Sequence, residues 1–150
     1  MTEKSVSVAD LIPLFQESLA AGNTVRFSPR GTSMRPMLRQ GRDVVILSAV
    51  KGPLRKYDIP FYQRDDGAYV LHRVVKCGET YTCIGDNQYE LEPGIRQDQL
   101  IAVLSGFVRG GKYIPVTNLG YRIYSRLWHW SRPARRLAGK VKRKIRKLFR

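Results

Sequence analysis

The sequence is poor in cysteine, in histidine and in long apolar runs, and each shortage excludes a class of protein. It has two cysteines and two histidines in 150 residues. These are too few for a disulfide-stabilised scaffold, and they do not cluster in the way a zinc site requires. No stretch reaches the roughly 18 consecutive apolar residues of a transmembrane helix. We therefore expect a chain without a membrane span, a metal ion or any other cofactor.

The N-terminal stretch also lacks the features of a secretory signal. It reads MTEKSVSVADLIPLFQ, without a basic start, an apolar core and a small-residue cleavage site. The expected compartment is therefore the cytoplasm. Cys77 and Cys83 flank a predicted hairpin turn, and in a reducing compartment they are expected to be free thiols rather than a disulfide.

Acidic side chains are missing from the last 30 residues, and their absence locates the net charge of +15. The segment 121–150 holds 12 Lys and Arg and no acid, whereas the first 120 residues hold 15 basic and 12 acidic residues, or +3. The body of the chain is therefore nearly neutral. With 43% hydrophobic residues, it is long enough to fold around a core of its own.

The pattern of apolar residues in the body predicts one short helix followed by short strands. Apolar residues fall on one helical face over 8–21, and Gly22-Asn23 is a typical helix stop. Turn residues then separate runs typical of β-strands. The predicted strands cover 25–28, 43–47, 59–62, 69–75, 81–84 and 100–108. We predict a mainly β fold, a small antiparallel sheet or barrel, with an N-terminal helical segment at 1–24, a core at 25–117 and a helical tail at 118–150.

The tail predicts two basic helices, at 121–130 and 133–150, with a break before Pro133. On the second helix Leu137, Val141, Ile145 and Leu148 form a narrow apolar stripe among Lys and Arg. The first is rich in aromatic residues typical of the membrane interface. The combination favours a helix lying in the plane of an anionic membrane surface. Docking on a protein or peptide partner and binding of nucleic acid remain alternatives, the latter less favoured because phosphate binding needs no apolar stripe.

Five short blocks carry the chemistry. They read GTSMRPML at 31–38, GRDV at 41–44, KYDI at 56–59, LHRVV at 71–75 and GDN at 85–87. In this order and spacing they resemble the type I signal peptidases and their relatives, which include the self-cleaving repressors of the SOS type. The resemblance covers about 27–108, slightly over half of the chain. It implies a mainly β serine peptidase.

Within that superfamily, the residue that serves as general base differs between branches. Bacterial housekeeping signal peptidases have a lysine where this sequence has His72, whereas the endoplasmic-reticulum and sporulation-type enzymes have histidine. The resemblance therefore implies Ser33 as nucleophile, His72 as general base and Asp86 as the supporting acid. Chemistry agrees, because a serine hydroxyl needs a base to remove its proton, and imidazole titrates near neutral pH. Backbone groups around Ser33, from Gly31, Thr32 and Met34, would position the site and supply an oxyanion hole.

Two positions depart from the family pattern. Where the Ser-His relatives have a second aspartate after the Gly-Asp-Asn block, this sequence has Glu92, a candidate supporting acid. Where many signal peptidases carry an oxyanion-donating serine, two residues before the nucleophile, it has Gly31.

The resulting hypothesis is an endopeptidase that cleaves a leader or signal-like peptide, works in the cytoplasm and associates with the inner face of the membrane. The alternative is a non-hydrolytic peptide-binding or regulatory module on the same fold, held to a membrane or partner by its tail. A self-cleaving regulator is less favoured, since the segment before the first strand is too short for a helix-turn-helix domain.

Overall fold

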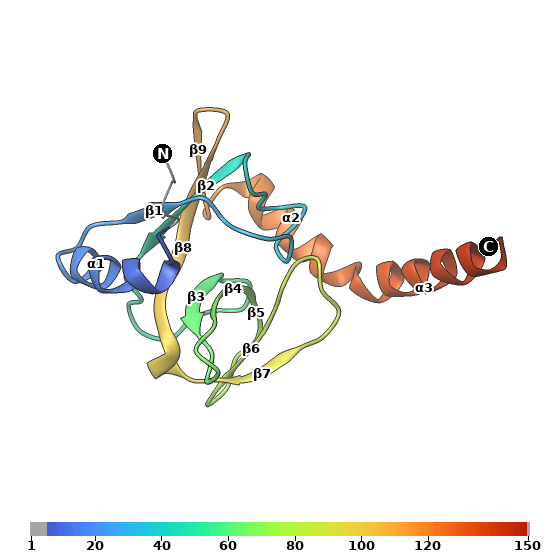
Figure 1. Cartoon of the computed structure of the whole chain (residues 1–150), viewed down its shortest axis with the longest axis horizontal. Coiled ribbons are helices and arrows are strands. Elements are labelled where there is room, and N and C mark those ends of the chain that lie inside the picture. The colour runs from blue at the N-terminus through green and yellow to red at the C-terminus, as the bar shows by residue number, and fades with distance from the viewer. Residues whose placement is uncertain (1–5, 150) are drawn as a thin grey trace. The chain divides into compact units, whose positions relative to one another are not determined.

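The computed structural model describes residues 6–149, and the chain divides into two compact units between Val116 and Thr117 (Figure 1). The first unit begins with helix α1 (Val8–Ala20) and then contains every described strand. These are β1 (Val25–Phe27), β2 (Asp43–Ser48), β3 (Pro60–Gln63), β4 (Tyr69–Leu71), β5 (Arg73–Lys76), β6 (Tyr81–Ile84), β7 (Glu92–Ile95), β8 (Leu100–Arg109) and β9 (Lys112–Pro115), with a short 3₁₀ helix, η1 (Gln97–Gln99), before β8. The second unit consists of α2 (Leu119–Trp130) and α3 (Arg132–Leu148).

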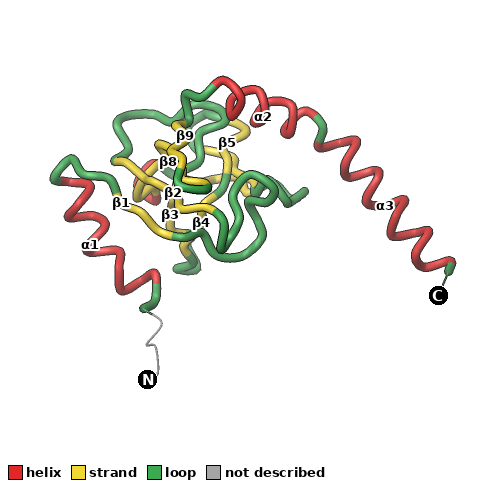
Figure 2. Tube along the Cα trace, turned by 90° about the horizontal axis from the view of Figure 1, so that it is seen from above, coloured by secondary structure: helices red, strands yellow, loops and turns green. Residues whose placement is uncertain are grey.

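The strands form two antiparallel sheets, which confirms the predicted mainly β class. One sheet has the order β1-β2-β8-β3-β4, with β9 paired to β8, and the other has the order β5-β6-β7. The long strand β8 pairs with β2 along one edge and with β3 and then β9 along the other. The pairing skips Ser105 of β8 opposite β2 and Ile101 of β8 opposite β3. These irregularities in β8 bend the larger sheet, which is curled in Figure 2.

Helix α1 begins and ends where the sequence predicts. The Ser7 hydroxyl accepts a hydrogen bond from the Asp10 amide at 3.3 Å, and the Asp10 carboxylate accepts one from the Ser7 amide at 3.2 Å. This reciprocal pair satisfies two amides that the first helical turn would leave unpaired. After the helix, Gly22 takes a φ of +82°, which favours glycine.

Between the two sheets lies a compact core that supports the segment joining β4 to β5. Its buried members are Leu54, Tyr62, Val70, Val74, Tyr81, Cys83 and Ile95. The two tyrosine hydroxyls in it are satisfied, because Tyr62 donates to Glu92 at 3.0 Å and Tyr81 donates to Gln97 at 2.8 Å. The core therefore fixes both strands that flank His72.

In the second unit, α2 and α3 succeed each other almost without interruption. The Asn118 side chain caps α2 by accepting a hydrogen bond from the Tyr121 amide at 3.0 Å. Pro133 lies in the first turn of α3, where its missing amide hydrogen costs no helical bond. Among the described helices, none is long and apolar enough to cross a bilayer.

Candidate active site

Ser33 and His72 line the same cavity of about 490 Å³. Its walls come from α1, β1, β3 and β4, together with the loop between β1 and β2 that carries Ser33. Most of the lining is apolar: Val6, Val8, Leu11, Phe15, Phe27, Met34, Leu38, Phe61, Tyr69, Val70 and Leu71. Rings from three of these elements form a row, in which Phe27 lies 5.9 Å from Phe15 and 5.6 Å from Phe61, centroid to centroid.

The Gly-Asp-Asn block holds the backbone on which Ser33 sits. The Asn87 amide donates to the Ser33 carbonyl at 2.8 Å, and the Asn87 side chain donates to the Thr32 carbonyl at 3.2 Å. Gly85 approaches so closely that a Cβ there would lie 2.6 Å from the Ser33 carbonyl oxygen. A residue larger than glycine does not fit, so this block holds the loop that carries Ser33 in place.

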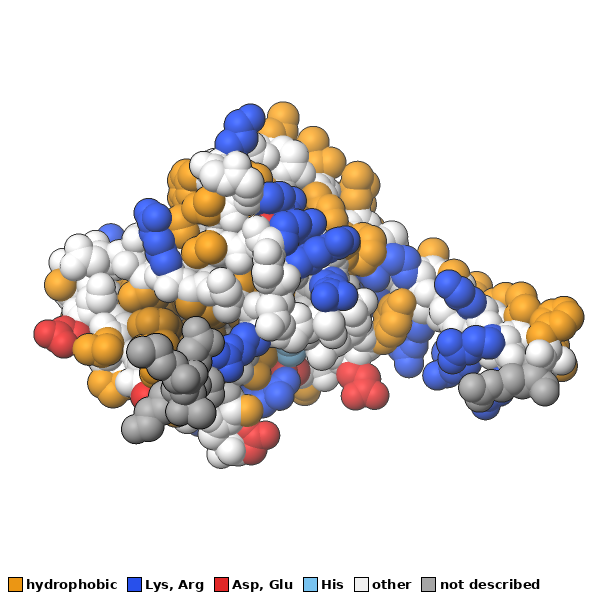
Figure 3. All heavy atoms as spheres, turned by 45° about the horizontal axis from the view of Figure 1, so that its top comes forward, with side chains coloured by type: hydrophobic (Ala, Val, Ile, Leu, Met, Phe, Trp, Pro, Cys, Tyr) orange, Lys and Arg blue, Asp and Glu red, His pale blue; other side chains and the backbone are white. Residues whose placement is uncertain are grey.

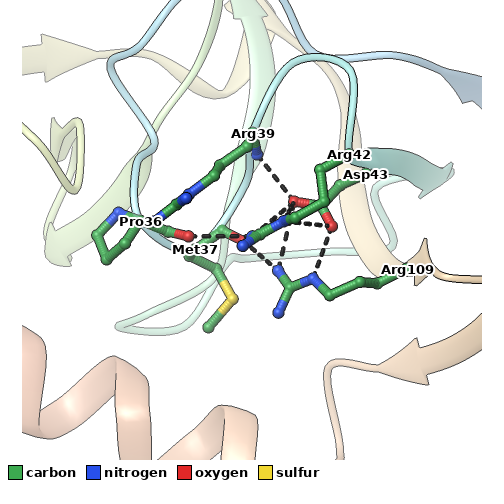
Figure 4. Close-up of polar contacts among 6 residues, drawn as sticks. All are labelled: Pro36, Met37, Arg39, Arg42, Asp43 and Arg109. Carbon is green, nitrogen blue, oxygen red and sulfur yellow. Dashed lines mark hydrogen bonds and ion pairs between the residues drawn. The ribbon is translucent and has the colours of Figure 1, made fainter.

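The C-terminal part of the same loop is held by hydrogen bonds to and around a buried carboxylate, that of Asp43 (Figure 4). Its oxygens accept from the side chains of Arg42 and Arg109 at 2.7–3.3 Å and from the Arg39 amide at 2.8 Å. Both arginines also donate to the Met37 carbonyl. Burial alone would raise the pKa of Asp43, but the bonds from Arg109 and Arg42 outweigh it and hold the pKa below its usual value.

His72 lies between β4 and β5 and is 3% exposed. Its Nδ1 is 3.5 Å from a carboxylate oxygen of Glu92, and its ring lies edge-on to Tyr62 with 6.5 Å between centroids. Burial lowers the pKa of His72 below its ordinary value, although the Glu92 charge opposes that shift. The imidazole is therefore neutral near pH 7, the state that a general base requires.

Glu92, at the start of β7, is the carboxylate beside the imidazole. It accepts two bonds from Arg64, at 2.6 and 2.8 Å, and one from the Tyr62 hydroxyl at 3.0 Å. Partial burial pushes the pKa of Glu92 upward, but the bonds from Arg64 and Tyr62, together with the neighbouring positive charge, outweigh it and lower the pKa overall. An ionised carboxylate thus faces Nδ1 of His72, where it can stabilise an imidazolium.

Asp86, which the resemblance implies as the supporting acid, is paired with a buried arginine. Its carboxylate is 0% exposed and accepts two bonds of 2.8 Å from the guanidinium of Arg73, which is 1% exposed. Arg73 also donates to the Tyr57 carbonyl. Asp86 therefore joins the Gly-Asp-Asn clamp to β5, the strand that follows His72, and the acid near the imidazole nitrogen is Glu92.

The residues predicted to take part in oxyanion binding lie around Ser33. Gly31, with a φ of +79°, and Met34 line the cavity beside Ser33. The Gly31 amide donates to the side chain of Gln40 at 3.1 Å. Thr32 is exposed, and its carbonyl accepts from the Arg35 amide as well as from Asn87. Gly31 and Thr32 thus shape the turn that presents Ser33.

Sequence reasoning missed three residues of this site: Tyr62, Arg64 and Arg73. Arg73 directly follows His72 in the LHRVV block, and its apolar neighbours were a signal that it would be buried and need an anion. Tyr62 lies on β3 and Arg64 directly follows that strand. Nothing in their spacing predicts that both side chains contact Glu92.

The described residues contain no group of three or more His, Cys, Asp or Glu side chains that could hold a metal ion. Comparisons with protein-family models, with curated proteins and with solved structures gave no significant match to this chain.

Proposed function

We propose that this protein is a serine endopeptidase that cleaves a peptide bond through an acyl-enzyme on Ser33. The observation that carries the proposal is the shared cavity: Ser33 and the buried, neutral imidazole of His72 line one apolar pocket, with ionised Glu92 behind the imidazole. The motif resemblance supports the same assignment. A cluster that served only stability would not need a hydroxyl and an imidazole to open onto the same cavity.

In this mechanism Nδ1 of His72 faces Glu92, which leaves Nε2 for the serine hydroxyl. As Oγ of Ser33 attacks the substrate carbonyl, its proton passes to His72, and the Glu92 carboxylate stabilises the imidazolium that forms. The tetrahedral intermediate collapses when His72 returns the proton to the departing amine, which breaks the C–N bond and leaves an ester on Ser33. His72 then takes a proton from water as that water attacks the ester carbonyl. It returns the proton to Oγ of Ser33 as the ester C–O bond breaks, which releases the acid and restores the serine.

Asp86 does not contact the reacting atoms in this mechanism and acts through its neighbours. Its bond to Arg73 fixes the strand after His72, and the neighbouring Asn87 holds the Ser33 backbone, so the Asp86 side chain positions nucleophile and base relative to each other. Asp86 is thus a positioning residue, and Glu92 supports the base.

The substrate class follows from the cavity lining. Because apolar side chains from α1, β1, β3 and β4 surround the nucleophile, the residues of the substrate nearest the scissile bond are apolar. A leader or signal-like segment has that character. We place the reaction in the cytoplasm, on segments presented from that side of the membrane.

The proposal is tested by incubating the purified protein with a peptide library and reading new termini by mass spectrometry. Wild type should produce new termini next to apolar residues, whereas Ser33→Ala and His72→Ala should produce none. Ser48→Ala, at a half-buried serine of β2, is the matched control and should cleave like wild type. Retained peptide binding without any cleavage by wild type would instead favour the non-hydrolytic module.

A further inference from the structure

Nine exposed apolar positions form one stripe along α2 and α3. On α2 they are Leu119, Ile123, Leu127 and Trp130, and on α3 they are Ala134, Leu137, Val141, Ile145 and Leu148. Successive members are three or four residues apart throughout. At about 100° per residue, all nine fall within an arc of about 80°. The large members are between 49 and 76% exposed, and Phe149, at 87%, extends the set beyond Leu148.

The junction between the two helices preserves this alignment. Ser131 has helical dihedral angles, with φ −75° and ψ −7°. Its amide donates to the Leu127 carbonyl at 2.9 Å, and its carbonyl accepts from the Arg135 amide at 2.9 Å. Helical hydrogen bonding therefore continues past the break that Pro133 indicates in the sequence. The stripe runs about 45 Å along the two helix axes at about 1.5 Å per residue.

Basic side chains occupy the rest of the α3 surface. The helix has nine Lys and Arg and no acidic residue, and at helical spacing all nine fall outside the apolar arc. Figure 3 shows apolar side chains along one side of α3 and Lys and Arg along another. One of them, Arg135, also secures the junction, since its guanidinium lies 3.7 Å above the Trp128 ring and donates to the Trp128 carbonyl.

Three occupants can be compared for this surface. A second copy of the helix would bring nine more cations to the same interface, and the body of the chain has no acidic excess to offset them. A nucleic acid would use the cations but leave the apolar stripe in water. An anionic bilayer satisfies both, because its headgroups pair with Lys and Arg while its acyl chains receive the apolar side chains.

We propose that α2 and α3 together form one amphipathic anchor that lies in the plane of an anionic lipid bilayer. The stripe from Leu119 to Leu148 enters the boundary between headgroups and acyl chains, and the basic residues stay at the level of the phosphates. Trp130, in the stripe and 64% exposed, lies at the headgroup level that tryptophan favours. This inference is independent of the peptidase proposal, and either one can fail without the other.

The first test is flotation of the full-length protein with phosphatidylcholine vesicles, prepared with or without phosphatidylglycerol. We expect binding to the anionic vesicles only, and weaker binding at high salt, because the Debye length falls from about 10 Å at 0.1 M to about 3 Å at 1 M. Equal binding to neutral vesicles, or no binding to anionic ones, would overturn the proposal.

Two matched variants distinguish the contribution of the apolar stripe to vesicle binding from the contribution of the basic side chains. The double change Val141→Ser with Ile145→Ser should weaken anionic-vesicle binding about 30-fold or more, since two branched apolar side chains lose their burial. Arg143→Ser, on the basic side of the same helix, should weaken it only about fivefold. The opposite result would have two parts: a duplex oligonucleotide would bind the protein more tightly than the vesicles do, and the Val141→Ser/Ile145→Ser variant would bind both like wild type. That result would overturn the proposal and identify the surface as a nucleic-acid site.

Tryptophan fluorescence gives a second readout that does not depend on those variants. The two tryptophans of the chain, Trp128 and Trp130, both lie on α2. At helical spacing Trp128 falls roughly opposite the stripe. We expect anionic vesicles to shift the wild-type emission to the blue and Trp130→Phe to lose most of that shift. A shift that survives Trp130→Phe unchanged would mean that the stripe does not face the bilayer.

Discussion

Glu92 and Asp86 are the two carboxylates near the proposed catalytic pair, and removal of their charge should change different properties. Loss of the Asp86 charge should mainly lower stability, and loss of the Glu92 charge should mainly slow the reaction of Ser33. Asp86→Asn leaves the guanidinium of Arg73 buried without its anion. Both groups are at most 1% exposed, and breaking such a pair costs about 3–5 kcal/mol. For a chain of this size that loss lowers the melting temperature by about 10–20 °C. Labelling of Ser33 in the fraction that remains folded should slow only modestly, because Asn87 still holds the Ser33 backbone and Glu92 still faces His72.

Glu92→Gln should instead slow the labelling of Ser33 and change the stability little. At 3.5 Å from Nδ1 of His72, a full charge in an effective dielectric of about 20 interacts by about 5 kcal/mol. Arg64 neutralises part of that charge, so we expect about half of the effect, or roughly a 100-fold slower reaction of Ser33. Because glutamine keeps an oxygen that can accept from Tyr62 or Arg64, the free energy of unfolding should fall by only about 1 kcal/mol.

The assay pairs the second-order rate of fluorophosphonate labelling with a thermal melt for each variant. The change Arg73→Met with Asp86→Leu is the control for Asp86→Asn, since replacing a buried ion pair by apolar residues of similar size is often neutral for stability. The assignment of roles is refuted if Asp86→Asn slows labelling about 100-fold at an unchanged melting temperature while Glu92→Gln labels at the wild-type rate.

Three further predictions concern other parts of the first unit. Gly85→Ala should destabilise the protein by about 1–3 kcal/mol in a denaturant titration and also slow labelling, because the new Cβ displaces the Ser33 carbonyl; a variant as stable as wild type would contradict the clamp. Burial lowers the pKa of His72, so the neutral base persists below pH 6.5, and the labelling rate should fall only below the lowered pKa; a profile whose midpoint lies above 6.5 would contradict this. Burial raises the pKa of Cys83 to about 12, so iodoacetamide should modify exposed Cys77 first in the native protein, and faster modification of Cys83 by peptide mapping would contradict its burial.

Most strands of the two sheets could be predicted from the sequence, because short runs rich in apolar residues lie between turn residues. The predicted strand at 100–108 corresponds to β8, and the one at 81–84 to β6. The predicted strand 69–75 is divided at His72 into β4 and β5, which belong to different sheets. Apolar residues lie on both sides of His72-Arg73 without a turn residue between them, so the pattern gave no sign that the chain changes sheets there.

Two strands were not predicted at all. The short strand β7 contains Pro93 and Gly94, which are typical of a turn, and it forms because pairing with β6 overrides that local preference. Strand β9 follows the Gly110-Gly111 turn, and its own residues have little apolar alternation. Its place is determined by the hairpin with β8.

The candidate site could be predicted only in part, and the reason is physical. The motif blocks brought Ser33 and His72 to attention, and both line the cavity. The choice between Asp86 and Glu92 depends on which arginine each carboxylate meets. Arg64 follows β3 and Glu92 begins β7, so the two residues are 28 positions apart and adjoin strands of different sheets. Such a pairing is a property of the packed sheets and leaves no periodic signal in the sequence.

The central claim is that His72 activates Ser33, and covalent labelling tests it most directly. A fluorophosphonate reacts when the serine oxygen displaces fluoride from phosphorus, a step that requires an activated hydroxyl. The account predicts one adduct per chain, mapped to Ser33 by peptide mass spectrometry, and its loss in the folded fraction of both Ser33→Ala and His72→Ala. An adduct on another residue, or labelling of Ser33 at the wild-type rate in folded His72→Ala, would contradict it.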